Sequence, residues 1–300
     1  MPRLNYRHLE YFWHVVREGG VTAASDVLHV SQPSISAQLR KLEDALGYEL
    51  FHRDGRSLTL THEGKVVFGY ADEIFRIGRE LTRTVEGRMT GRPMRLVVGV
   101  SSTVPNLVTF HLLAPAFEMD DPVRVVGREG PSERLLAELA AHELDLIISD
   151  RPVPGDSRVQ AFTHPLGSSP VDIVGPPLLA HRLREGFPAT LDDEPFILPS
   201  EGYALRTSLE QWFERRSVRP RVFAEIEDND LINTFGEAGG GMFAVPSVIT
   251  EELRVRYALE VVGRAEGLSE EFFAISAERR LHHPAVVAIT EGARADLFSA

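Results

Sequence analysis

Residues 22–53 decide the architecture of the first part of the chain and read TAASDVLHVSQPSISAQLRKLEDALGYELFHR. Four apolar residues recur here at spacings of three and four, the pattern of one buried helix face: Ile35, Leu39, Leu42 and Leu46. Ser31 precedes them as an N-cap, Pro33 falls in the first turn, where proline is tolerated, and Gly47 follows as a C-cap. The sequence therefore predicts a helix from about residue 32 to residue 46.

Two shorter helices are predicted before this one. The first ends at Gly19-Gly20 and carries apolar residues at helical spacing: Leu9, Phe12, Trp13 and Val16. The second covers about 22–28, and we expect its inner side to hold Ala23, Ala24, Val27 and Leu28. After the third helix, the extended runs 50–53 and 57–60 flank residues 54–56, which indicates a hairpin. Together these elements predict a winged helix-turn-helix over residues 1–61 that places its third helix in the major groove of DNA.

The outer face of the predicted third helix and the hairpin supply the candidate DNA-binding residues. They are Ser31, Gln32, Pro33, Ser34, Ser36, Ala37, Arg40, Lys41, Arg53 and Arg56. Small side chains let the helix approach closely, and the amide of Gln32 can pair with adenine. Arg53 and Arg56 suit the phosphate backbone or a minor groove. The alternative is a structural three-helix bundle, which the balance of 12 Lys+Arg against 12 Asp+Glu in residues 1–90 supports.

A longer helix is predicted over residues 62–90. Its seam residues alternate at spacings of three and four, like a heptad seam: Val67, Tyr70, Ile74, Ile77, Leu81 and Thr84 or Val85. We expect this linker helix to pack lengthwise on the same helix of a second copy. The alternative is one amphipathic helix that lies on its own domain.

Residues 91–300 alternate short β-branched runs with helical stretches. Strands are predicted near 96–100, 123–128, 146–148, 159–163, 171–174, 196–198, 222–226, 242–245 and 272–275, and helices over 104–117, 133–142, 205–216, 230–238 and 247–254. This α/β order favours a mostly parallel sheet with right-handed crossovers. We expect two α/β lobes with a cleft between them, lobe I about 91–160 and 266–300, and lobe II about 161–265.

Candidate ligand-binding residues follow the predicted strands, where open α/β sheets leave a crevice. They are Ser101, Ser102, Thr103, Ser200, Glu201, Arg206, Asp228 and Asp230. Arg206 suits a carboxylate, whereas the oxygen-rich stretch 225–230 suits a hard cation, so the identity of the ligand stays open. The alternatives are simple N-capping for Ser102 and Thr103, and the preference of acidic residues for helix N-termini for Asp228 and Asp230.

Composition narrows the classes of function. The net charge is 32 − 44 = −12, which does not fit a protein that coats nucleic acid non-specifically. Cysteine is absent, which excludes thiolate nucleophiles and Cys-ligated metals, and no apolar run is long enough for a membrane helix. We expect no catalytic set, metal or cofactor, and a cytoplasmic protein. The competing hypothesis is an α/β binding protein or enzyme with a helical N-terminal dimerisation domain.

The chain resembles the LysR-type transcriptional regulators. The residues that carry the resemblance are Thr22-Ala23-Ala24, Leu28 to Ser36, Leu42-Glu43, Leu46-Gly47, Leu50-Phe51 and Arg53. The resemblance implies a two-lobed effector domain like type 2 periplasmic binding proteins, a homodimer or homotetramer, an inverted-repeat operator in double-stranded DNA and a small effector. Ala37 departs from the longer side chain that many members carry, which leaves more base readout to Gln32, Ser36 and Arg53.

A narrower set of residues resembles the members that activate sodium/proton antiporter genes. It includes Tyr11-Phe12-Trp13, Tyr70-Ala71-Asp72 and the stretch 205–248. This resemblance implies an activator that responds to sodium or pH.

Overall fold

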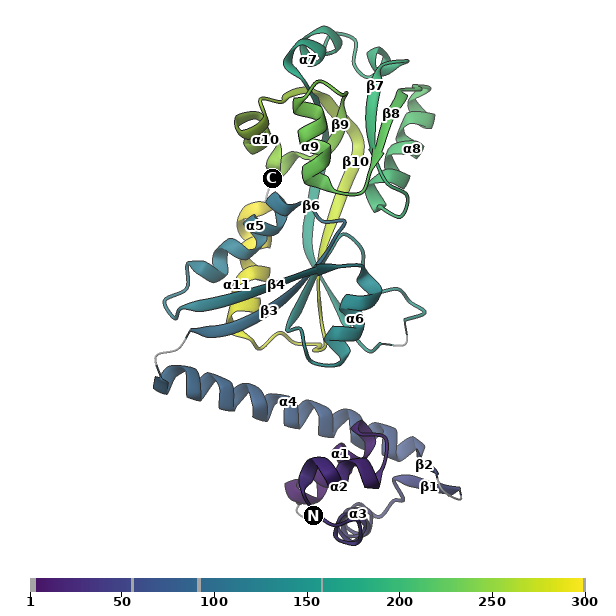
Figure 1. Cartoon of the computed structure of the whole chain (residues 1–300), viewed down its shortest axis with the longest axis vertical. Coiled ribbons are helices and arrows are strands. Elements are labelled where there is room, and N and C mark those ends of the chain that lie inside the picture. Colours follow the sequence, from purple (N-terminus) through teal and green to yellow (C-terminus); the bar gives the residue numbers. More distant parts are fainter. Residues whose placement is uncertain (1–3, 55–56, 91–92, 158, 299–300) are drawn as a thin grey trace. The chain divides into compact units, whose positions relative to one another are not determined.

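The computed structural model describes residues 4–54, 57–90, 93–157 and 159–298. The chain divides into two compact units, residues 1–92 and 93–300, here called the N-terminal and C-terminal units. Each unit has its own hydrophobic core. The N-terminal unit is coloured purple to blue and the C-terminal unit blue through green to yellow (Figure 1).

The N-terminal unit confirms the predicted helix-turn-helix and hairpin. Its elements are α1 (Tyr6–Arg17), α2 (Val21–Leu28), α3 (Gln32–Leu46), β1 (Phe51–Asp54), β2 (Ser57–Leu60) and α4 (His62–Thr90). Gly47 ends α3 in the left-handed conformation at φ 78°, which explains why glycine stands there. Ser31 occupies the N-cap position of α3, but its hydroxyl bonds to the Ser34 hydroxyl at 2.8 Å instead of capping the helix.

The core of the N-terminal unit lies between α1, α3 and the start of α4. Its large buried residues are Leu9, Phe12, Trp13, Ile35, Leu39 and Leu42. The expected inner side of α2 was wrong for two residues: Ala24 is buried and Leu28 half-buried, but Val27 is 51% exposed and Ala23 is exposed too. An eight-residue helix presents only a narrow face to the core, and in α2 Ala24 marks its centre.

The seam of α4 divides into residues that pack on their own unit and residues that are exposed, which the sequence did not separate. Val67 and Ile74 pack against the core of their own unit around the fully buried Ala71, so the alternative interpretation holds for these two seam positions. Three seam residues remain exposed: Tyr70 (66%), Ile77 (45%) and Leu81 (63%). The side chains of Thr84 and Val85 lie outside the described residues.

The C-terminal unit contains eight strands and seven α-helices within its described residues. They are β3 (Met94–Ser101), α5 (Asn106–Phe117), β4 (Val123–Gly130), α6 (Ser132–Ala140), β5 (Leu146–Ser149), β6 (Phe162–Gly175), α7 (Pro177–Leu183), β7 (Pro195–Pro199), α8 (Ala204–Arg216), β8 (Arg221–Ile226), α9 (Asn229–Glu237), β9 (Phe243–Pro246), α10 (Thr250–Tyr257), β10 (Glu260–Ser276) and α11 (Pro284–Gly292). Helices α7 and α11 and the first half of β10 were not predicted.

The expected mostly parallel sheet was wrong, because the sheet is mixed. The six-stranded sheet has the order β4-β3-β5-β10-β6-β9, and a two-stranded sheet pairs β7 with β8. Strands β3, β4 and β5 are parallel, as are β7 and β8, but β10 runs antiparallel to both β5 and β6, and β6 to β9. The long return strand β10 lies between strands that come earlier in the chain, an arrangement that local periodicity does not reveal.

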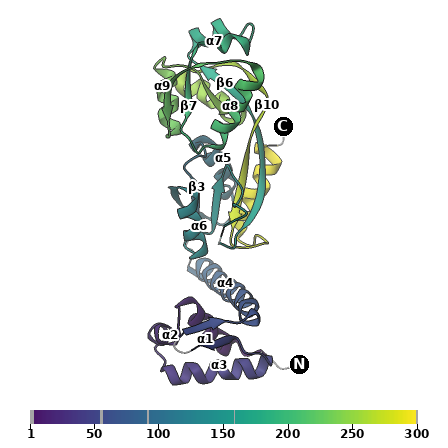
Figure 2. The same cartoon turned by 90° about the vertical axis from the view of Figure 1, so that its right-hand side faces the viewer.

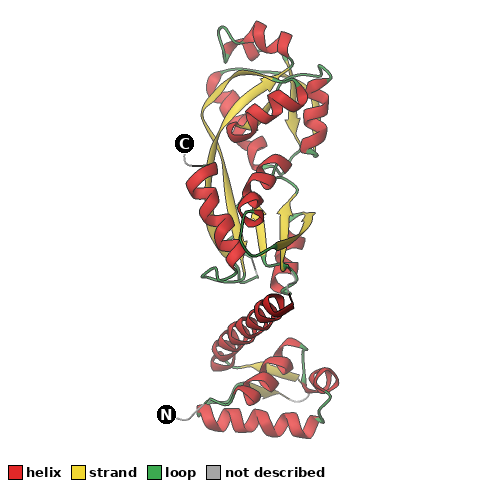
Figure 3. Ribbon diagram, turned by 90° about the vertical axis from the view of Figure 1, so that its left-hand side faces the viewer, coloured by secondary structure: helices red, strands yellow, loops and turns green. Residues whose placement is uncertain are grey.

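Two lobes share the strands β6 and β10. Lobe I contains β3, β4 and β5 with α5, α6 and α11, and lobe II contains β7, β8 and β9 with α7 to α10 (Figure 1 and Figure 2). Strands β6 and β10 run through both lobes as one long ribbon (Figure 3). Their pairing is interrupted between Arg264 and Ser269, so the ribbon bends where one lobe passes into the other.

Candidate DNA-reading surface and interlobe cavity

The outer face of α3 is open to solvent, as the sequence predicted. Its described candidate residues are exposed apart from Ser36, which is half-buried: Ser31, Gln32, Pro33, Ser34, Ala37, Arg40 and Lys41. The opposite face is fixed in the core by Ile35 (0% exposed) and Leu42 (1%). A helix held on one side, with amide, hydroxyl and cationic groups on the other, has the form needed to enter a major groove.

The hairpin is only partly described. Strands β1 and β2 pair with Phe51 opposite Leu60, as a wing requires. The side chain of Arg53 and the whole of Arg56 lie outside the described residues, so the structure places neither group. The first turn of α4 lies against the start of the wing, because the absent Cβ of Gly64 leaves space for the carbonyl of Leu50.

The two lobes of the C-terminal unit meet through polar contacts. The Tyr203 hydroxyl, just before α8, donates to the carbonyl of Ser102 in lobe I at 3.3 Å and to the carbonyl of Glu227. The side-chain amide of Asn106 on α5 donates to Asp230 on α9 at 2.8 Å. Two predicted site residues, Ser102 and Asp230, thus each contact a residue of the opposite lobe.

Tyr203 also lines a cavity of about 30 Å³. Residues of both lobes line it: Thr103, Pro105, Pro199, Tyr203, Leu205, Asn229, Ile232, Asn233, Phe243, Ala244, Val245, Pro246, Ile249 and Glu270. The cavity has room for at least one water molecule. Tyr203, on the wall, has its pKa raised to about 12, by burial first and then by the carboxylates of Glu227 and Asp150.

Glu270 is the functional candidate that the sequence analysis missed. The residue is 5% exposed, and burial, followed by the charge of Asp150, raises the pKa of its carboxyl to about 8. Asp150 itself accepts a 2.5 Å hydrogen bond from Thr103, whose hydroxyl also meets that of Ser101 at 2.8 Å. The available sequence signal was a glutamate at an inward position of a strand, but β10 was not predicted to extend back to residue 270.

Among the predicted ligand-binding residues, Thr103 is the one that lines the cavity as the described residues form it. The Ser101 hydroxyl contacts that of Thr103. Helix α5 begins at Asn106 with no side-chain cap, so simple N-capping was wrong for Ser102 and Thr103. Asp228 caps α9 by accepting from the amide of Leu231 at 2.7 Å, which is the alternative role given for it. Among the described residues, no group of three or more His, Cys, Asp or Glu could hold a metal.

Arg206 is not brought together with Thr103. Its guanidinium donates to Glu210 at 2.6 Å, to the Pro199 carbonyl at 2.9 Å and to Glu225 at 3.3 Å. It lines a second, open hollow of about 340 Å³ formed by α8, β7 and β8. Ser200 and Glu201 lie in the turn after β7 and do not line the cavity. The expected carboxylate clamp therefore has no arginine at the interlobe cavity.

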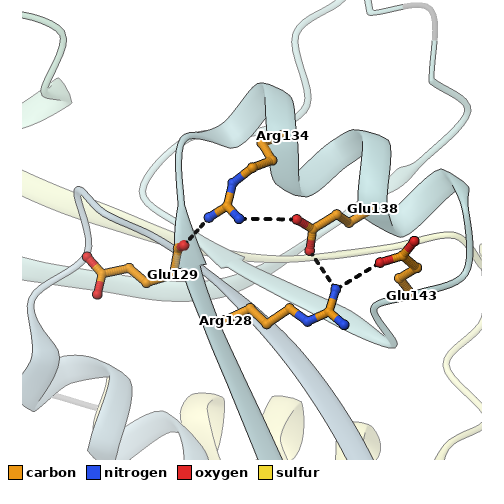
Figure 4. A network of polar contacts seen from close by, with 5 residues as sticks. All are labelled: Arg128, Glu129, Arg134, Glu138 and Glu143. Atoms are coloured by element: carbon orange, nitrogen blue, oxygen red, sulfur yellow. Dashed lines mark hydrogen bonds and ion pairs between the residues drawn. The ribbon is translucent and has the colours of Figure 1, made fainter.

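A network of four charged side chains lies elsewhere on lobe I. Arg128 on β4 donates to Glu138 at 3.0 Å and to Glu143 at 2.9 Å, and Arg134 donates to Glu138 at 3.3 Å and to the carbonyl of Glu129 (Figure 4). The hydrogen bonds that Arg128 donates to Glu143 and Glu138 raise the pKa of its guanidinium. The cations and carboxylates pair with one another, so the network fixes α6 to β4.

The fold and the two sites define a class of protein. A winged helix-turn-helix followed by a long helix and a two-lobed α/β binding domain is the architecture of a ligand-responsive transcriptional regulator. Two family models match the chain: "Bacterial regulatory helix-turn-helix protein, lysR family" over residues 6–65, and "LysR substrate binding domain" over residues 90–297. The chain belongs to the LysR family of transcriptional regulators.

Individual relatives support this assignment. The transcriptional activator protein NhaR of Escherichia coli K12 is 31% identical over 301 residues, which cover 100% of this chain and 98% of NhaR. The regulator PcaQ of Agrobacterium fabrum is 30% identical, over 79% of this chain and 75% of PcaQ. The crystal structure of full-length CbnR complexed with target DNA shares the fold, with a TM-score of 0.54 and 20% identity over 97% of this chain and 99% of CbnR. No helix among the described residues is long and apolar enough to cross a membrane.

Proposed function

We propose that the chain is a cytoplasmic transcriptional activator that binds an inverted-repeat operator, and that it is not an enzyme. The observation that carries the proposal is α3, whose apolar face is buried while Gln32, Arg40 and Lys41 face solvent. The role of activator is supported by the full-length similarity to NhaR, whose name describes an activator. Residues 1–61 would read DNA, residues 62–90 would dimerise, and residues 91–300 would bind the effector.

The proposed base contacts are Gln32 and Ser36, with Ser31, Pro33, Ser34 and Ala37 allowing close approach. Arg40 and Lys41 would contact phosphates, as would Arg53 and Arg56 on the wing. The N-terminal amides of α3 would add a phosphate contact, because Ser31 leaves them without a side-chain acceptor.

Dimerisation is proposed to use the exposed residues of the α4 seam, Tyr70, Ile77 and Leu81, and further contacts of the C-terminal unit would complete a tetramer. An effector would bind in the interlobe cavity, near Ser101, Ser102 and Thr103, and favour one arrangement of the lobes. Five predicted effector contacts do not line the cavity in this arrangement of the lobes, and we propose that they reach the effector in another arrangement: Ser200, Glu201, Arg206, Asp228 and Asp230. The resemblance to antiporter activators makes a sodium/proton antiporter gene the first target to examine.

A gel shift tests this function directly. The full chain is titrated against the DNA upstream of its own gene, and against DNA upstream of any neighbouring antiporter gene, with excess unrelated DNA as competitor. We expect a shifted band that survives the competitor and weakens steeply with salt. A chain that binds none of these DNAs more tightly than the competitor would contradict the proposal.

A further inference from the structure

We propose that the interlobe cavity binds the protonated amino group of a small organic amine, with Glu270 as its anionic partner and Thr103 as a neighbouring acceptor. The inference rests on the proposed function, because it names the chemical class of the effector for that cavity.

Glu270 is the group that calls for a ligand. It lines the cavity from β10, the strand that passes between the lobes, and only 5% of it is exposed. One of its carboxylate oxygens, Oε2, is buried with no hydrogen-bond partner among the described residues. An ionised carboxylate in such a place is costly unless it is paired with a cation, so without one it keeps its proton.

The surrounding charges favour a cation and exclude an anion. None of the described residues that line the cavity is Lys, Arg or His. The charge that acts on Glu270 is that of Asp150, and those that act on Tyr203 across the cavity are Glu227, Asp150, Asp228 and Glu129, all carboxylates. A ligand with one positive charge would therefore be attracted by all of these groups.

The shape and lining favour an amine over a metal ion. A volume of about 30 Å³ fits an ammonium group, which is close to a water molecule in size. Hard metal cations such as Ca²⁺ take six or more oxygen ligands, and the side chains that line the cavity offer few: Glu270, Thr103, Tyr203 and two asparagines. Most of the lining is apolar, including Leu205, Ile232 and Phe243, which suits the alkyl part of an amine once the lobes separate slightly.

Binding exchanges the proton of Glu270 for the ammonium ion, so the net charge of the site does not change. The amine enters as its ammonium form, the proton of Glu270 leaves to solvent, and the ammonium N–H groups donate to the freed carboxylate and to Thr103. Binding therefore strengthens as pH rises toward 8, where Glu270 loses its proton more easily.

Methylammonium chloride is the probe, added to the full chain at pH 7.5, with equal concentrations of sodium chloride and tetramethylammonium chloride as controls for salt and charge. We expect methylammonium at ten times its Kd to raise the melting temperature of the C-terminal unit by roughly 3–5 °C. It should also release about one proton per chain into weakly buffered solution. Neither control salt should do so, since tetramethylammonium has no N–H donors and sodium has neither N–H donors nor an alkyl group.

Two variants locate the site. Glu270→Gln keeps the shape of the neutral acid but cannot become an anion, so it should weaken methylammonium binding at least tenfold. Glu271→Gln, at the exposed neighbouring position, should bind as the unsubstituted chain does. An equal shift with sodium chloride, or methylammonium binding that survives Glu270→Gln, would overturn the inference, as would no shift with any salt. Operator binding measured without amine tests the proposed function separately, and Glu270→Gln should retain it.

Discussion

The indole N–H of Trp13 on α1 donates a 2.8 Å hydrogen bond to the carboxylate of Asp72 on α4. The guanidinium groups of Arg17 and Arg79 each lie 5.0 Å from the centre of the same indole ring. Trp13 therefore connects the helix-turn-helix to the helix that is proposed to dimerise. Through it, the direction of α4 and the position of α3 are fixed together.

Trp13→Phe should loosen this connection. The variant keeps an aromatic ring but loses the donor to Asp72, which should cost about 1–3 kcal/mol in the stability of the N-terminal unit. Operator affinity should fall as well, because paired heads then lose their fixed separation. Urea unfolding followed by circular dichroism, together with a gel shift, measures both quantities.

Trp212→Phe is the matched control, because Trp212 donates to the Glu266 carbonyl within lobe II. It should destabilise the C-terminal unit and leave the unfolding of the N-terminal unit unchanged. If Trp13→Phe alters neither stability nor operator affinity, the link between α1 and α4 has no role in DNA binding.

Leu81→Asp tests the proposed dimer seam. Leu81 is 63% exposed on α4, so the aspartate costs little in a monomer but would be buried without a partner in a dimer. Light scattering should show particles of about half the mass or less, and operator binding should weaken. Val255→Asp, at a 71% exposed position on α10, should change neither. Unchanged mass and affinity in Leu81→Asp would place the dimer contact elsewhere.

Glu270→Gln should also change how stability depends on pH. The folded pKa of Glu270, about 8, lies above its ordinary value, so the folded chain binds the extra proton between about pH 4.5 and 8. Stability from this group is thus fully present at low pH and is lost as the pH rises, by at most about 1.4 kcal/mol per pH unit. Urea midpoints at pH 5.5 and 8 should differ less in Glu270→Gln than in Glu271→Gln. Equal differences would mean that Glu270 titrates normally.

Gln32→Ala and Ser36→Ala test base readout. Each should cost about 1–3 kcal/mol in operator binding if the side chain reaches a base edge, while binding to unrelated DNA stays the same. Gln211→Ala, an exposed glutamine on α8, is the matched control and should bind the operator normally. Operator affinity unchanged in both α3 variants would mean that another surface reads the sequence.

The sequence predicted the N-terminal unit well because its signals are local. The apolar spacing from Ile35 to Leu46 and the terminal Gly47 define α3 without reference to distant residues. Prediction of the α4 seam was less complete. Periodicity found Val67, Ile74 and Leu81 alike, and only the folded unit shows that the first two pack on their own core.

The interlobe site was harder to predict because it depends on long-range pairing. Thr103 was expected from its place after β3, but its partner Asp150 comes from the end of β5, 47 residues later. Glu270 lies opposite Ser169, in a strand whose register is interrupted. Arg206 matched the expected chemistry of a carboxylate site, yet Glu210 and Glu225 hold its guanidinium outside the cavity. Such competition for a side chain is visible only in three dimensions.

Selection of bound DNA from a random pool by the full chain is the sharpest test of sequence-specific, paired DNA recognition, because it works even when the operator is unidentified. We predict enrichment of an inverted repeat whose half-sites are separated by about one helical turn of 10 bp or a multiple of it. The same pool selected with Leu81→Asp should lose the repeat, and selection with the Gln32→Ala, Ser36→Ala double variant should lose the sequence preference. Enrichment of no sequence, or only of single unpaired sites, would contradict the proposed mode of DNA binding.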